Sequence, residues 1–172
     1  MKRADRIAVR ALAVAACVAC ALLASGQKLP WQTSASMNPG DSQLVHFLYP
    51  QQVTLPAGKP QTIELHFRIN AGLHINSHEP RQKSLIRTEL IEAEPTGVTI
   101  SAVDFPAGSD YAFPLDPQEK LSVYSGEFVL KMHLTTQKGN HLVQGALRYQ
   151  ACDTNTCFPP RNVPVAVDVI GR

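Results

Sequence analysis

Residues 62–69 read TIELHFRI, and this stretch decides the fold class. Apolar and polar side chains alternate along it without a break. A repeat of two residues is the side-chain repeat of a β-strand, so the alternation indicates a strand with one buried face and one face in water. The buried face would carry Ile63, Leu65, Phe67 and Ile69.

The same alternation recurs along the chain between residues that favour turns. The strong examples are residues 127–134, 141–151 and 163–169, and the weaker ones are 44–49, 73–76, 88–92 and 98–105. No long stretch after the N-terminal region has a helical period, so the sequence predicts an all-β fold of about 7–8 antiparallel strands. Two sheets that each have one apolar face must cover one another, which favours an immunoglobulin-like β-sandwich. A closed barrel or a jelly roll is the alternative.

One segment departs from the alternation. Residues 105–121 read FPAGSDYAFPLDPQEKL and include three prolines. We interpret this segment as a long loop, and long loops in compact domains are often functional.

The N-terminus has the layout of a secretory signal peptide over residues 1–26. Basic residues precede an apolar run over 11–24, and the small residues Ser25 and Gly26 follow it. This run is shorter than the roughly 20 apolar residues of a membrane-spanning helix, so cleavage is favoured over anchoring. The alternative is a lipoprotein, because the residues before Cys17 loosely resemble a lipidation site.

Removal of the leader changes the charge and the cysteine count. We expect a flexible lead-in over residues 27–42 and a folded domain over 43–172, with no stable membrane span after cleavage. The leader takes four of the 16 basic residues and one of the 14 acidic ones, which leaves 12 against 13. A net charge of −1 gives no case for nucleic-acid binding. The only cysteines left are Cys152 and Cys157, in a compartment where disulfides persist.

These two cysteines are the main candidate site. Residues 149–160 read YQACDTNTCFPP, so a strand end and a four-residue turn lie before Cys157, and two prolines follow soon after it. Such a turn can bring two cysteines within disulfide range. Closing so short a loop gains only about 2 kcal/mol, which favours a reversible dithiol/disulfide pair over a structural bridge. Both interpretations stay open from these residues alone.

The same residues carry a family resemblance. Tyr-Gln-Ala-Cys, a short spacer, Cys-Phe-Pro-Pro and a valine-rich strand resemble the end of the periplasmic N-terminal domain of DsbD, the thiol:disulfide interchange protein. Residues 72–75 (GLHI) and 123–128 (VYSGEF) are similar to two further segments of that family. The resemblance spans residues 44–169, nearly the whole mature chain.

The resemblance implies an immunoglobulin-like fold and a protein-disulfide reductase relay that needs no cofactor. It implies that Cys157 forms the mixed disulfide with a partner and that Cys152 resolves it. The expected electron donor is a separate thioredoxin-like protein or membrane thiol transporter, and the expected acceptors are disulfide-containing proteins of the periplasm. The family shields its sulfurs with an aromatic residue, a place that Phe113 or Tyr111 would take here.

Two other functions remain as alternatives. One is a periplasmic copper- or zinc-binding module that uses Cys152, Cys157 and a histidine, because thiolates and imidazoles suit both metals. Each histidine, including His74 and His78, is by itself expected to be an ordinary surface residue. The other alternative is an inert sandwich in which the disulfide only fastens a turn.

Overall fold

The computed structural model describes residues 43–172, except residues 94 and 114–115. The predicted signal peptide (1–26) and lead-in (27–42) lie outside the described residues. The secondary structure within the described part consists of twelve strands, which confirms the all-β class. None of it is a helix that could cross a membrane.

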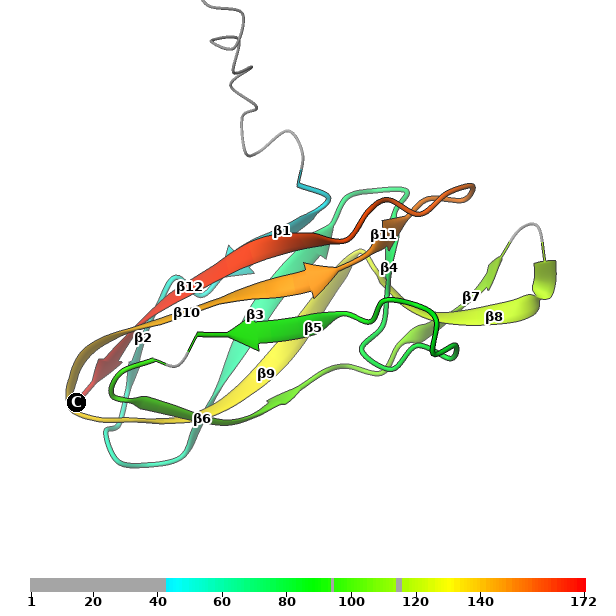
Figure 1. Cartoon of the computed structure of the whole chain (residues 1–172). Coiled ribbons are helices and arrows are strands. Elements are labelled where there is room, and N and C mark those ends of the chain that lie inside the picture. The colour runs from blue at the N-terminus through cyan, green and yellow to red at the C-terminus, as the bar shows by residue number, and fades with distance from the viewer. Residues whose placement is uncertain (1–42, 94, 114–115) are drawn as a thin grey trace, which may run out of the picture. The chain divides into compact units, whose positions relative to one another are not determined.

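The strands form three sheets (Figure 1). The first sheet has the order β1 (Val45–Tyr49), β3 (Gln61–Ile69), β9 (Glu127–Thr136), β6 (Val98–Asp104). The second has the order β2 (Gln52–Leu55), β12 (Arg161–Gly171), β10 (Gly139–Tyr149), β5 (Glu89–Glu92). The third has the order β11 (Ala151–Cys152), β4 (His74–Asn76), β8 (Asp116–Ser125), β7 (Ser109–Phe113).

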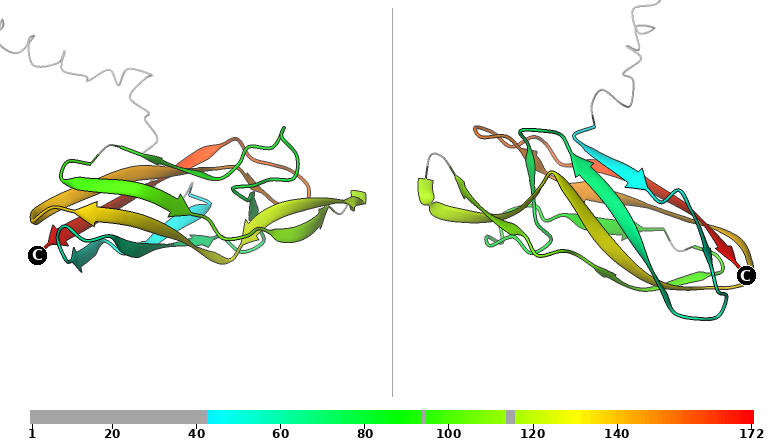
Figure 2. Two further views of the ribbon diagram at one scale, coloured as in Figure 1. Left: turned by 90° about the horizontal axis from the view of Figure 1, so that it is seen from below. Right: turned by 180° about the vertical axis from the view of Figure 1, so that it is seen from behind.

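The first two sheets are the layers of a sandwich (Figure 2). Their apolar faces meet in one core cluster, which draws on β3 and β9 from one sheet and on β10 and β12 from the other. The alternation in TIELHFRI is confirmed, because Ile63, Leu65, Phe67 and Ile69 are all buried. The strand at the C-terminal end of the chain behaves in the same way, with Val163, Val165, Val167 and Val169 buried.

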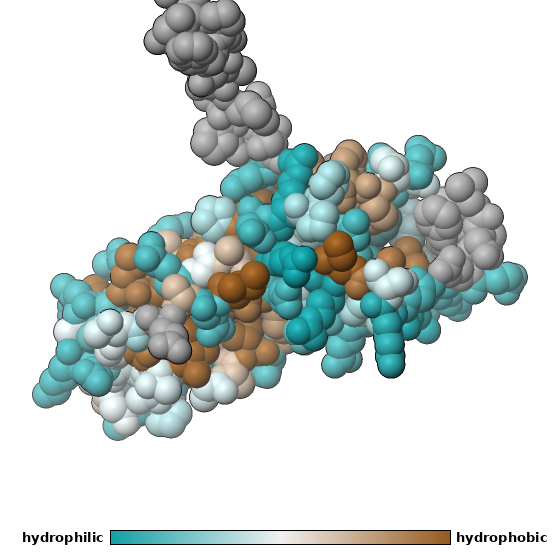
Figure 3. All heavy atoms as spheres, viewed as in Figure 1, coloured by the Kyte–Doolittle hydropathy of each residue, from teal (hydrophilic) through white to brown (hydrophobic). Residues whose placement is uncertain are grey.

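The outward face of the second sheet remains mixed in character. Ile91 on β5 and Leu142 on β10 are each 49% exposed. Figure 3 shows apolar residues scattered among polar ones on this side of the molecule. Single exposed apolar residues of this kind are normal on a protein surface.

The prediction of a long loop over residues 105–121 is wrong, because most of this segment forms the hairpin of β7 and β8. Tyr111 pairs with Leu121 and Ala112 with Lys120 before the register shifts. Few described side chains of the hairpin's outer part are buried. The alternation that reveals a half-buried strand is therefore missing.

The strand predicted over residues 141–151 is divided in two. β10 ends at Tyr149 in the second sheet, and β11 begins at Ala151 in the third, with Gln150 between them. The short strand β2 was not predicted, and it pairs in parallel with β12. The division at Gln150 sends the chain from the sandwich into the third sheet, at the end of the sandwich away from the C-terminus (Figure 1).

Candidate functional site

Strand β11 fixes the position of the first cysteine. It pairs with β4 in antiparallel register, Ala151 opposite Ile75 and Cys152 opposite His74. Ala151 and Ile75 belong to the sandwich core. Successive side chains of a strand point to opposite faces, so Cys152 and His74 share the other face of the sheet.

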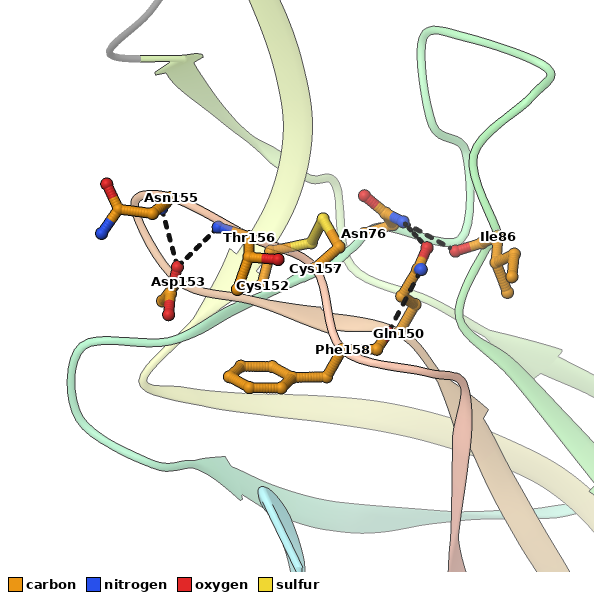
Figure 4. Close-up of a disulfide and its surroundings, with 9 residues drawn as sticks. All are labelled: Asn76, Ile86, Gln150, Cys152, Asp153, Asn155, Thr156, Cys157 and Phe158. Atoms are coloured by element: carbon orange, nitrogen blue, oxygen red, sulfur yellow. Dashed lines mark hydrogen bonds between the residues drawn. A yellow bond between two sulfur atoms is a disulfide. The ribbon is translucent and has the colours of Figure 1, made fainter.

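A tight turn after β11 brings back the second cysteine, and Cys152 and Cys157 are joined by a disulfide (Figure 4). Their Cα atoms are 4.0 Å apart, and the S–S distance is 2.03 Å. The backbone closes around the turn: the amide of Asp153 donates to the carbonyl of Thr156 (2.9 Å), and that of Phe158 donates to the carbonyl of Ala151 (2.8 Å).

The Asp153 side chain holds the inside of this turn. Its Oδ1 accepts hydrogen bonds from the backbone amides of Asn155 and Thr156, both at 2.7 Å (Figure 4). These two bonds lower the pKa of the Asp153 carboxyl, because they favour its charged form. A carboxylate therefore lies beside Cys152 at neutral pH.

The two cysteines differ in their access to solvent. Cys152 is 3% exposed, whereas Cys157 is an exposed residue. Attack on a disulfide requires that the incoming thiolate reach one of its sulfurs. The site therefore presents Cys157 to another molecule and keeps Cys152 behind it.

Hydrogen bonds of two side-chain amides connect the segments on either side of the disulfide. The Asn76 side chain, which is buried, donates to the carbonyl of Ile86 (2.9 Å) and to Oε1 of Gln150 (3.4 Å). Gln150 in turn donates to the carbonyl of Phe158 (3.3 Å). The strands and loops on both sides of the disulfide are thus tied to β4.

On the face that carries Cys152, the ring of His74 packs against the ring of Tyr111. His74 is 4% exposed, and the centroid of its ring lies 4.1 Å from that of the Tyr111 ring. Burial lowers the pKa of His74, and the charge of Asp153 opposes this in part. The prediction of an ordinary surface histidine is wrong for His74, because this residue is buried. The sequence could not reveal this, since a single histidine in a short strand does not indicate that the strand pairs with Cys152.

Residues 44–168 match the family described as thiol:disulfide interchange protein DsbD, N-terminal. The chain belongs to the DsbD N-terminal domain family. No curated protein matches the chain in a sequence search.

The solved structures that are similar to the chain include two periplasmic domains. The DsbD N-terminal domain of Neisseria meningitidis in the reduced form shares 17% identity with a TM-score of 0.39, over 63% of this chain and 77% of that one. The N-terminal periplasmic domain of ScsB from Proteus mirabilis shares 15% identity with a TM-score of 0.45, over 67% of this chain. The match spans 42% of the ScsB chain, less than half of its length.

Membership of the DsbD N-terminal domain family confirms the immunoglobulin-like sandwich and implies thiol–disulfide exchange. Of the two aromatic residues expected to cover the cysteines, Tyr111 lies against the neighbour of Cys152. The side chain of Phe113 lies outside the described residues.

The described part of this DsbD N-terminal domain offers no group of three histidine, cysteine, aspartate or glutamate side chains that could hold a metal ion. His78 is engaged elsewhere, since its Nδ1 lies 2.9 Å from the carbonyl of Thr88 and its ring stacks on Phe105. His133 lies between Thr62 and Asp104 on the outer face of the first sheet. No arrangement among the described residues favours the metal-binding alternative.

Proposed function

We propose that this chain is a periplasmic thiol–disulfide exchange module in which Cys152 and Cys157 are the reactive pair. It takes electrons from a thioredoxin-like or membrane thiol-transporter donor and reduces disulfides of partner proteins, as a component of a protein-disulfide reductase relay. One observation carries the proposal: in a DsbD N-terminal domain, a disulfide joins an exposed Cys157 to a buried Cys152.

The unequal exposure supports a definite order of steps. In the reduced domain the Cys157 thiolate attacks one sulfur of a partner disulfide, and the partner's other sulfur leaves as a thiolate. Cys152 then attacks the sulfur of Cys157 in the mixed disulfide. The Cys152–Cys157 bond forms, the bond to the partner breaks, and the partner leaves with two electrons. A donor dithiol restores the reduced pair by the same steps in reverse.

The order of steps is tested by trapping. Cys152→Ala leaves Cys157 able to attack but removes the thiol that releases the partner. We expect this variant to accumulate covalent adducts with periplasmic proteins, visible on non-reducing gels and identified by mass spectrometry. The matched control is Cys157→Ala, which keeps the buried thiol and should give few adducts. Equal trapping by both variants would contradict the assigned roles.

The redox potential of the pair tests the function itself. An exchange module should equilibrate with glutathione at a potential between about −270 and −120 mV, the span of known exchange proteins. A bridge that stays oxidised below about −300 mV behaves as a structural disulfide, and that result would remove the basis of the relay.

A further inference from the structure

The buried thiol of the pair presents a chemical difficulty. To release a partner, Cys152 must react as a thiolate, because the thiol is a poor nucleophile. Cys152 is 3% exposed, and burial disfavours the thiolate. The Asp153 carboxylate that follows it in sequence disfavours a second negative charge at the same place. The second step of exchange therefore needs a group that takes the proton from Cys152.

His74 occupies the place from which this proton can be taken. It lies directly opposite Cys152 in the pairing of β4 with β11. Opposite residues of an antiparallel pair have their Cβ atoms roughly 5 Å apart on the same face of the sheet. An imidazole on one strand is thus the cross-strand neighbour of the thiol on the other.

The surroundings of His74 keep its ring neutral and in place. Burial lowers the pKa of the imidazole, and a neutral imidazole has one nitrogen free of hydrogen that can accept a proton. Tyr111 of β7 packs against the ring at a centroid distance of 4.1 Å. Besides Cys152 and Tyr111, the charged group that acts on His74 is Asp153, which stabilises the imidazolium once it forms.

We propose that His74 accepts the proton of Cys152 when this cysteine resolves the mixed disulfide. The proton passes from the Cys152 sulfur to the imidazole, and the thiolate attacks the Cys157 sulfur. The disulfide within the domain forms, and the bond to the partner breaks. The partner's sulfur leaves as a thiolate and takes a proton from the imidazolium or from water. This step rests on the proposed function, because it assumes that Cys152 resolves an adduct on Cys157.

The proposal is tested with Ellman's reagent as the disulfide. The reduced domain releases a first thionitrobenzoate when Cys157 attacks, and a second when Cys152 resolves the adduct, so the two steps are recorded separately. His74→Gln keeps a buried polar side chain but cannot take the proton. We expect an unchanged first phase and a second phase about 100-fold slower at pH 7, the low end for proton transfer by a positioned side chain. The difference should close at alkaline pH, where Cys152 ionises without help.

The control is His78→Gln, which replaces a partly buried histidine that lies against the carbonyl of Thr88 and should leave both phases unchanged. A second phase of His74→Gln that equals the wild type, or that is slowed equally at every pH, would overturn the proposal. If the first phase is missing in the wild type, the proposed function fails instead, and the two failures are told apart.

A measurement on the unmodified ring covers the case in which the variant does not fold. Interacting groups titrate as a pair, so the NMR signals of His74 in the reduced domain should show a second step at the pH where Cys152 ionises. This step should be absent in Cys152→Ala. A single, unchanged titration of His74 in both proteins would overturn the proposal.

Discussion

At the scale of single residues, Asp153 shows how one side chain builds the turn of the reactive pair. Its carboxylate accepts hydrogen bonds from two backbone amides that would otherwise need water as their partner. The same charge lies beside Cys152 and acts on His74. One carboxylate thus shapes the loop and sets the electrostatics of the groups around it.

The stability of the domain should depend on pH through this carboxyl group. Its pKa is lower in the folded state than the ordinary value of 3.8, so its ionised form stabilises the fold above that value. This contribution is lost as the pH falls through the lowered pKa. We expect Asp153→Ala to unfold at a lower temperature than the wild type at pH 7, with a difference that shrinks in strong acid. Thermal unfolding across pH checks this, and a difference that is independent of pH would contradict it.

At the scale of elements, the hairpin of β7 and β8 continues the third sheet beside β4, the strand that pairs with Cys152. Tyr111 reaches from this hairpin to His74. Asp110 beside it forms an ion pair with Arg81 in the neighbouring loop and lies 3.9 Å from Lys120. These groups are exposed, and exposed ion pairs contribute little. The hairpin therefore contacts the site through the pairing of β8 with β4 and through the Tyr111 ring.

Removal of this ring should open the buried cysteine to reagents. We expect Tyr111→Ala to speed alkylation of Cys152 by iodoacetamide in the reduced domain and to leave alkylation of Cys157 unchanged, as read by mass spectrometry. Tyr49→Ala is the control, because that ring stacks on His66 and is 50% exposed. An unchanged rate at Cys152 would show that Tyr111 does not shield it.

The elements also show which parts of the structure follow from the sequence. A strand with one face on the core needs alternating apolar and polar residues. For this reason the sequence predicts β3, β9, β10 and β12. The described side chains at the outer part of the hairpin of β7 and β8 are exposed or only partly buried, so they show no such pattern. The cysteines are recognisable by type and spacing. His74 is not, because its meaning depends on a pairing between strands 78 residues apart.

At the scale of the whole molecule, the disulfide joins two residues of one turn and does not link the two sheets of the sandwich. The core cluster joins the two sheets of the sandwich, whereas the disulfide closes a loop with a sequence separation of 5. A bridge over so short a loop removes little freedom from the unfolded chain. The two oxidation states should therefore share one fold.

The short loop predicts the effect of reduction on stability. Reduction of the disulfide, or the double change Cys152→Ser with Cys157→Ser, should lower the free energy of unfolding by no more than about 2 kcal/mol. Urea unfolding of the oxidised, reduced and doubly substituted forms measures it. A reduced form that is unfolded at 25 °C would contradict the prediction.

The unequal exposure of the two cysteines has a consequence for the order in which partner proteins bind. If Cys157 is the only point of covalent attachment, then the donor and the recipient compete for the same sulfur atom. The two partners therefore bind covalently one after the other and never at the same time. On the proposed function, the domain transfers two electrons per cycle, and it can bind the recipient covalently only after the donor has left.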